Sequence, residues 1–175
     1  IIGNRFSANL GFHLSLFNVE NKTYTSFQPR LSARYQLTDN MALKASYTKM
    51  SQYIHLLSSY TITMPTDLWV PATANIKPMQ ANQFSIGGYY TGFKDFELSV
   101  EAYYKNMHNV LEYKDGASFF GSSYNWESKV ETGKGRAMGI EFMVQKKVGK
   151  TTGWLAYTLA KSDRKFAKDG INNGK

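Results

Sequence analysis

Apolar and polar residues alternate along two neighbouring stretches of the chain, residues 27–37 and 41–47. Odd positions are apolar in both stretches and even positions are mostly polar, which is the period of a β-strand. A three-residue loop at 38–40 sets the expected cross-strand pairs, which are Leu37 with Met41, Tyr35 with Leu43, and Ala33 with Ala45. Both strands then present their apolar residues on one face, so the pattern predicts a β-hairpin.

Further strands follow from the same pattern. Residues 84–90 and 96–105 alternate around a loop at 91–95, and residues 135–162 predict a third hairpin that turns at 148–151. One more strand is expected over residues 10–16, and no segment of ten residues carries the apolar stripe of an amphipathic helix. The chain therefore reads as all-β, with about seven strands in an antiparallel up-and-down meander.

The connections between these strands differ in length. The turns near residues 39, 93 and 149 are short, whereas the links at 51–81 and 106–133 are long, so tight turns are expected at one end of the sheet and long loops at the other. A stretch of 11 alternating residues also matches the roughly 9–11 residues of a tilted membrane strand. This organisation favours part of a transmembrane β-barrel. A soluble β-sandwich that serves as an adhesion or binding module remains an alternative at this point, because its core requires the same alternation.

The two faces of such a barrel wall would differ in chemistry. The residues expected to face a wet lumen are Arg30, Arg34, Lys44, Glu97 and Glu101. Arg34 is expected opposite Lys44, and a hydrated lumen tolerates that pair better than an ordinary sheet does. The aromatic residues placed toward the ends of the apolar face are Tyr35, Tyr47, Tyr90, Phe96 and Tyr104. They fit the aromatic girdles of membrane barrels.

Composition narrows the possible functions. The chain has no cysteine, so thiolate metal sites and cysteine nucleophiles are excluded. Its 21 Lys+Arg and 13 Asp+Glu give a net charge of +8, but the positive residues are scattered, which argues against nucleic-acid binding. A mean hydropathy of −0.41, with no apolar run of 18 residues, excludes a transmembrane helix but leaves a membrane barrel open.

No constellation of residues predicts catalysis or a cofactor. His13, His55 and His108 each stand without a second ligand at i+2 or i+4, so no metal site is expected. No G-x-S-x-G elbow supports a serine nucleophile, and the glycine-rich "GKGRAMG" leads into a strand instead of a phosphate-binding helix. We therefore expect no enzyme.

Three segments carry a resemblance to a known family. Residues 68–90, "LWVPATANIKPMQANQFSIGGYY", resemble the loop-to-strand passage of TonB-dependent outer-membrane receptors, although Met79 stands where the family often has Glu. Residues 96–113, "FELSVEAYYKNMHNVLEY", and 131–166, "ETGKGRAMGIEFMVQKKVGKTTGWLAYTLAKSDRKF", resemble later strands of the same barrel. By this resemblance, residues 1–175 are a partial β-barrel domain of a longer receptor, and the plug domain is not in this segment.

The resemblance implies a location, a function and partners. The whole receptor would lie in the outer membrane of a Gram-negative bacterium, in contact with its lipid. It would bind a scarce nutrient, such as a siderophore or an oligosaccharide, at extracellular loops and import it by TonB-coupled movement of the plug. TonB would act through an N-terminal region outside this segment, and a surface lipoprotein is a possible partner. A passive porin-like channel is the closest alternative function.

Loop aromatic residues are the candidates for ligand binding. Phe119, Phe120, Tyr124 and Trp126 lie in the polar stretch "DGASFFGSSYNWES", and Trp69 lies in "TDLWVP". Exposed rings of this kind stack on sugars, siderophores or a partner protein. Packing of these rings against a neighbouring loop is the alternative.

Overall fold

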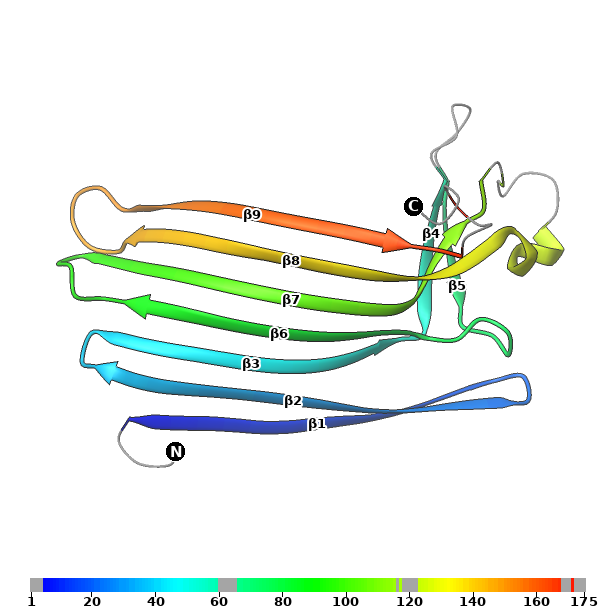
Figure 1. The fold of residues 1–175 in the computed structure, drawn as a ribbon, viewed down its shortest axis with the longest axis horizontal. Coiled ribbons are helices and arrows are strands. Elements are labelled where there is room, and N and C mark those ends of the chain that lie inside the picture. Colours follow the sequence, from blue (N-terminus) through cyan, green and yellow to red (C-terminus); the bar gives the residue numbers. More distant parts are fainter. Residues whose placement is uncertain (1–4, 60–65, 116, 118–122, 168–170, 172–175) are drawn as a thin grey trace.

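The computed structural model describes residues 5–59, 66–115, 117, 123–167 and 171. Most of them form one seven-stranded antiparallel sheet, with the strands in the order β1-β2-β3-β6-β7-β8-β9 (Figure 1). The strands are β1 (Phe6–Val19), β2 (Lys22–Thr38), β3 (Met41–Gln52), β6 (Met79–Tyr90), β7 (Phe96–Tyr113), β8 (Val130–Lys146) and β9 (Gly153–Lys165). Each strand of this sheet pairs with the next one along the chain, apart from the detour between β3 and β6. The predicted meander of about seven strands is therefore confirmed.

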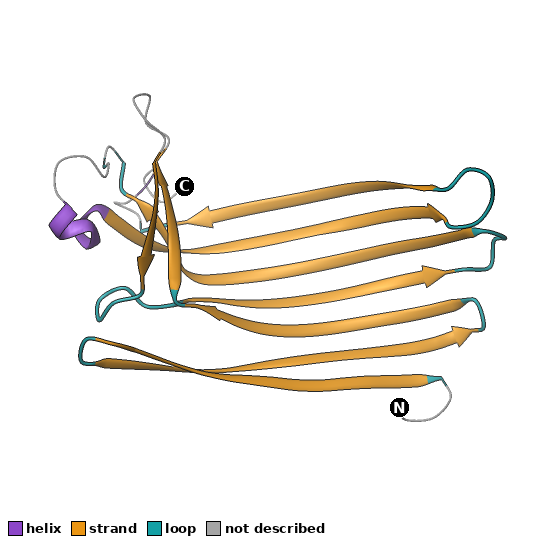
Figure 2. Cartoon of the chain, turned by 180° about the vertical axis from the view of Figure 1, so that it is seen from behind, coloured by secondary structure: helices purple, strands orange, loops and turns teal. Residues whose placement is uncertain are grey.

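A second, smaller element stands at one end of the sheet. Strands β4 (Ile54–Ser59) and β5 (Thr66–Pro71) form a two-stranded hairpin that is inserted between β3 and β6. Figures 1 and 2 show this hairpin standing at a steep angle to the long strands, near the short 3-10 helix η1 (Ser123–Lys129). We call this end of the sheet the loop end. The opposite end, where β2–β3, β6–β7 and β8–β9 connect, is the turn end.

The sheet has an apolar face and a polar face. One row of directly paired residues crosses six strands on the apolar face: Tyr35, Leu43, Gly88, Val100, Phe142 and Tyr157. Large side chains of this face are exposed, and no second sheet covers it among the described residues. A β-sandwich would bury this face against a partner sheet. The soluble sandwich alternative is therefore not supported, and no described helix is long and apolar enough to cross a membrane.

The register of the first predicted hairpin is confirmed except at its turn. Tyr35 pairs with Leu43, as expected, and the pairs on both sides of it follow the predicted register. Close to the turn, however, Met41 pairs with Thr38 and not with Leu37, because the register shifts between Gln36 and Thr38. The turn is thus shorter by one residue, and Leu37 is accommodated as an irregularity in β2.

The short turns near residues 39, 93 and 149 lie together at the turn end, as predicted, but the loop end also holds a tight turn that was not predicted. Strands β1 and β2 are joined at the loop end by only two residues, Glu20 and Asn21, and Glu20 adopts a positive φ of 52°. The long links are also shorter than expected, because β7 continues to Tyr113 and β8 already begins at Val130. A register shift between His108 and Val110 lets the two strands continue pairing. Asn109, at the shift, has a φ of 56°.

Candidate functional site

The five residues predicted to face a lumen lie on the polar face of the sheet. Strand alternation places Arg30 and Arg34 on this face of β2, Lys44 on β3, and Glu97 and Glu101 on β7. One row on this face runs from two basic residues, Arg34 and Lys44, through Gly87 to two acidic residues, Glu101 and Glu141. Arg34 and Lys44 are therefore directly paired, as predicted, and a second like-charged pair, Glu101 and Glu141, faces them across Gly87.

An aromatic ring connects the two halves of this row. The Lys44 ammonium nitrogen lies 3.8 Å from the centroid of the Tyr89 ring, and the Tyr89 hydroxyl donates a hydrogen bond to the Glu101 carboxylate. Gly87 makes room for this arrangement, since a Cβ atom there would lie 2.9 Å from Cγ of Glu101 and 3.3 Å from the Tyr89 ring. The ring attracts the cation through its π face and the carboxylate through its hydroxyl.

Two other features fix side chains on the polar face. Lys147, just after β8, forms a 2.7 Å ion pair with Glu97 at the turn end. Tyr103 lies over Gly139 of the neighbouring strand, because a Cβ atom at Gly139 would come within 2.9 Å of the Tyr103 ring and hydroxyl. The ring thus covers the backbone of Gly139, which has no side chain of its own to shield it from solvent. Aromatic residues commonly cover strand glycines in this way.

The loop end is held together by its own small hydrophobic core. The buried residues of this core are Leu57, Val70, Ile76, Leu111 and Val130, and Leu68, Tyr113 and Trp126 pack against them. They come from the β4–β5 hairpin, from the loop after it, and from the ends of β7 and β8. This core fixes the hairpin on the end of the sheet, so the loop end presents a defined surface.

Hydrogen bonds tie the loop after β5 to the tip of the β1–β2 hairpin. The Tyr24 hydroxyl donates to the carbonyl oxygen of Thr73 at 2.7 Å, and the Lys22 ammonium donates to that of Ala74 at 3.0 Å. On the other side, the Asn109 amide donates to the carbonyl oxygen of Pro78 at 2.9 Å. Two strands, β2 and β7, therefore position one loop, and the two bonds from β2 join residues about 50 positions apart in the chain.

A small polar pocket lies beside this loop. Its volume is about 200 Å³, and its lining includes Tyr24, Ser26, Ser51, Tyr53 and Lys77. The hydroxyls of Ser26 and Ser51 are 2.5 Å apart. The Ser15 hydroxyl on β1 accepts a hydrogen bond from the Gln28 amide on β2 and is 2.6 Å from the Tyr53 hydroxyl. The pocket thus offers hydroxyl groups and one ammonium group to a ligand. Sequence reasoning missed it, although an aromatic Tyr24 at a polar-face position was an available signal.

The five aromatic candidates differ in their positions. The side chain of Trp69, on β5, is 65 % exposed and lies on the same side of the hairpin as Leu56 and Ile54, which are also exposed. Trp126, on η1, packs against the loop-end core. Phe119 and Phe120 lie outside the described residues, and only the backbone of Tyr124, within η1, is described. Trp69 is therefore the candidate whose ring the structure shows on an exposed surface.

One titratable side chain is buried in the loop end. His55, on β4, is only 3 % exposed, and its Nε2 has no hydrogen-bond partner among the described residues. Burial lowers the pKa of this imidazole from its ordinary value of 6.5, because the charged form is poorly solvated there. The described residues hold no group of three His, Cys, Asp or Glu side chains placed to bind a metal ion.

Comparison with known proteins identifies the family. The model of the family described as "TonB dependent receptor-like, beta-barrel" matches residues 2–175, and comparisons with curated proteins and with solved structures give no match. The members of this family are transporters, not enzymes, and typically lie in the Gram-negative outer membrane. An open meander with one apolar and one polar face is the architecture expected for part of such a barrel. The chain belongs to the β-barrel family of TonB-dependent receptors.

Proposed function

We propose that this chain forms part of the wall and the loops of an outer-membrane active transporter. The apolar face of the sheet contacts lipid, the polar face lines the lumen, and the loop end is extracellular. The complete receptor binds a scarce nutrient at the loop end, and force transmitted by TonB moves a plug domain to let the nutrient pass. Membership of the family and the separation of the two faces support this assignment.

The exposed position of Trp69 on a packed hairpin is the observation that carries the binding role. Trp69 is 65 % exposed, and exposure of a large apolar ring to water is unfavourable. The neighbouring Val70 is buried, which fixes the orientation of the hairpin and therefore of the ring. The polar pocket lined by Tyr24 and Tyr53 lies on the same end of the sheet. An aromatic platform and hydroxyl-rich pockets together suit a ligand with both ring faces and hydroxyl groups, such as an oligosaccharide or a siderophore.

The size of the pocket limits what it holds by itself. Complete small-molecule sites occupy roughly 300–1,000 Å³, and this pocket has about 200 Å³. We therefore assign to it one part of a larger ligand. The loop aromatic residues Phe119, Phe120, Tyr124 and Trp126 remain proposed contributors from the neighbouring segment. The exposed apolar side of the β4–β5 hairpin also offers a contact for a surface lipoprotein.

A growth experiment on intact cells tests this function. A strain lacking the complete receptor is compared with its parent on a panel of oligosaccharides and of ferric siderophores, each as the sole source of carbon or iron. We expect loss of growth on one class of nutrient, and the same loss in a strain with inactive TonB. Growth that depends on the receptor but not on TonB would favour a passive porin-like channel. Growth unaffected by either loss on every nutrient would contradict a role in uptake.

A further inference from the structure

The apolar face of the sheet changes its chemistry where β8 and β9 approach the loop end. A row of paired residues on this face contains Leu31, Tyr47, Phe84, Tyr104, Met138 and Lys161. Lys161 thus occupies in β9 a position that the neighbouring strands fill with apolar or aromatic residues. The next positions toward the loop end on β8 are Arg136 and Lys134, again on the same face.

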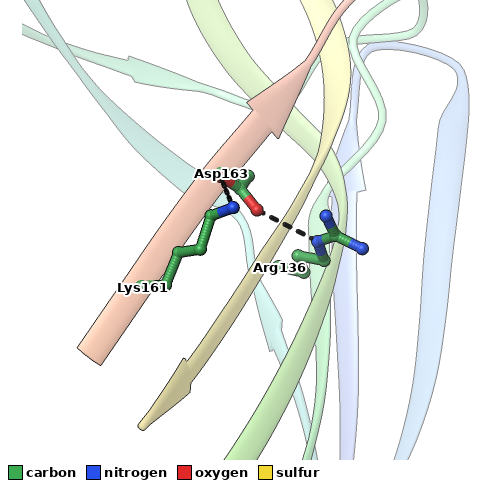
Figure 3. A network of polar contacts seen from close by, with 3 residues as sticks. All are labelled: Arg136, Lys161 and Asp163. Carbon is green, nitrogen blue, oxygen red and sulfur yellow. Dashed lines mark hydrogen bonds and ion pairs between the residues drawn. The ribbon is translucent and has the colours of Figure 1, made fainter. Parts of the chain in front are cut away.

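A carboxylate arranges two of these cations. Asp163 lies between Arg136 and Lys161, with Oδ2 3.1 Å from Nε of Arg136 and Oδ1 3.7 Å from Nζ of Lys161. In Figure 3 the dashed line from Asp163 reaches Nε of Arg136 and not either of its two terminal nitrogens. The side chains of Arg136 and Lys161 remain 55 % and 68 % exposed. The guanidinium therefore keeps its bidentate edge for another acceptor, a geometry that suits phosphate.

A second pair of cations extends the cluster. Lys134 and Lys165 are direct cross-strand partners on β8 and β9, and both are exposed. Like charges directly opposite each other destabilise a sheet, and an anion bound between them would remove that cost. We call Lys134, Arg136, Lys161 and Lys165, with Asp163, the basic cluster. Its four cations and one anion leave a formal charge of +3.

The basic cluster adjoins an apolar groove. The cluster lines a hollow of about 780 Å³ whose wall includes Tyr104, and Tyr104 also borders a groove of about 580 Å³ on the same face. The groove runs along a row of paired residues that contains three alanines and one isoleucine: Ala33, Ala45, Ile86 and Ala102. Its lining is almost wholly apolar. An apolar groove that meets a cationic hollow at a tyrosine matches the shape of an amphiphile, with a chain on one side and an anionic headgroup on the other.

A tyrosine with an apolar and a polar contact lies at the boundary between the two regions. Tyr47 packs its ring on Phe84, with centroids 4.7 Å apart, while its hydroxyl donates a 2.9 Å hydrogen bond to Oδ1 of Asn82 in the next row. Asn82 belongs to the same row as Arg136. The side chain of Tyr47 is half-buried, and tyrosines that combine an apolar ring contact with a hydrogen-bonded hydroxyl are enriched at membrane interfaces. The basic cluster thus begins where the apolar part of the face ends.

We propose that this surface binds one lipid whose headgroup carries two or more phosphate charges. The phosphates contact Arg136, Lys161 and the Lys134–Lys165 pair, and an acyl chain lies in the apolar groove. A formal charge of +3 exceeds what one singly charged phosphodiester would neutralise, which favours a multiply phosphorylated headgroup. The assignment of this lipid to the outer leaflet rests on the proposed function, which places the loop end outside the cell.

The experiment uses the complete receptor, purified from outer membranes in a non-ionic detergent. Co-purified lipid is quantified by phosphorus analysis and by mass spectrometry of the intact complex. The variant Arg136→Gln with Lys161→Gln removes two cations of the cluster. The matched control, Lys94→Gln with Lys150→Gln, removes two cations from exposed turns at the turn end. Heat-dependent migration on gels verifies folding of both variants, and Lys161→Gln alone serves as a milder substitution.

Added probes identify the headgroup. They are lipid A with two phosphates, its monophosphorylated form, phosphatidylglycerol, and inorganic pyrophosphate without an acyl chain. We expect lipid A to bind about tenfold or more tightly than the other probes, since each charged hydrogen bond contributes about a factor of ten or more. The cluster variant should lose about 100-fold in affinity for lipid A, while the control variant should bind like the parent.

Three results would overturn the proposal. They are equal lipid retention by the parent and the cluster variant, equal affinity for phosphatidylglycerol and lipid A, and displacement of the lipid by equimolar pyrophosphate. Because binding is measured in detergent, it does not depend on transport. Nutrient uptake by the same variants, measured in cells, shows separately whether the proposed transport function fails.

Discussion

Lys44 and Tyr89 meet on the polar face of the sheet, with the Lys44 ammonium nitrogen 3.8 Å from the centroid of the Tyr89 ring. Arg34 is the direct cross-strand partner of Lys44, so the ring contacts one member of a like-charged pair. The Tyr89 hydroxyl continues the contact to Glu101. A single tyrosine therefore links the basic and acidic halves of a polar row, and substitutions at this position separate the two contributions.

We expect Tyr89→Leu to lower the free energy of unfolding by about 1 kcal/mol, because it removes an exposed cation–π contact and a hydrogen bond. Tyr89→Phe keeps the ring over Lys44 and loses only the bond to Glu101, so its effect should be smaller. Urea titration of the detergent-folded receptor measures both variants. Equal destabilisation by the two substitutions would show that the contact between the ring and Lys44 contributes nothing to the free energy of unfolding.

The contact between Tyr103 and Gly139 predicts a steric effect. A Cβ atom at Gly139 would lie 2.9 Å from the Tyr103 ring and 3.0 Å from the carbonyl oxygen of Leu159, so Gly139→Ala should destabilise the sheet by about 1–3 kcal/mol. Gly11→Ala is the matched control, because Gly11 also lies within a strand and its nearest neighbour, the carbonyl oxygen of Arg30, is 3.8 Å away. Urea unfolding of the two variants provides the comparison. A larger loss at Gly11 than at Gly139 would contradict the close packing.

Two adjacent leucines on β4, one buried and one exposed, test whether packing stabilises the loop end. Leu57 is 2 % exposed within the loop-end core, whereas Leu56 is 41 % exposed on the other side of β4. We expect Leu57→Ala to cost about 2–5 kcal/mol locally and to open the loop after β5 to proteolysis. Leu56→Ala should leave the rate of cleavage nearly unchanged. Limited proteolysis with mapping of the cleavage sites measures both rates, and similar rates would argue against a packed loop end.

Trp69 should contribute to ligand binding without contributing to folding. Once the nutrient is known, Trp69→Ala should weaken its binding by about tenfold, since stacking on an aromatic ring contributes roughly 0.5–1.5 kcal/mol beyond the buried area. Trp154→Ala is the control, because Trp154 is similarly exposed but lies at the turn end. Isothermal titration with the purified receptor gives both affinities. Unchanged binding by the Trp69 variant would show that the exposed side of the β4–β5 hairpin does not contact the ligand.

His55 predicts that the loop end loosens in acid. Its pKa is lowered by burial, so below the ordinary value of about 6.5 the unfolded loop end binds more protons than the folded one. Stability should therefore be unaffected by this residue above about pH 6.5 and should fall as the pH drops below it. Hydrogen exchange of β4 and β5 at pH 7.5 and 5.5 measures the change. His55→Gln should weaken the dependence of this exchange on pH. An unchanged dependence would show that other titratable groups cause it.

The alternation of residues was sufficient to predict the long strands and most of the first register, because each of these strands has one apolar and one polar face. It failed for the β4–β5 hairpin. There Leu56 is exposed and Leu57 is buried, so apolar residues occupy both faces and no period of two appears. The bulge at Asn109 was missed for a related reason. The register shift there exchanges the residues that lie on the two faces of β7, so the alternation is interrupted although the strand continues.

The candidate site was less accessible to sequence reasoning than the sheet. The bond from Tyr24 to the carbonyl oxygen of Thr73 joins residues 49 positions apart, and such a contact leaves no local pattern. Trp69 was recognised as aromatic, but only the packing of Val70 beneath it shows which way the hairpin faces. The basic cluster on β8 and β9 depends on cross-strand register, which brings Arg136 beside Asp163.

The environment of alternate residues on one hairpin shows most directly whether the apolar face of the sheet contacts lipid. Spin labels on single cysteines at Leu31, Tyr35 and Leu43, and at Arg34 and Lys44, are compared in the complete receptor in lipid bilayers. We expect labels at the first three positions to collide mainly with oxygen dissolved in lipid, and labels at the last two with a water-soluble nickel chelate. Water accessibility at both sets of positions, or the opposite alternation, would contradict a barrel wall with its apolar face in lipid.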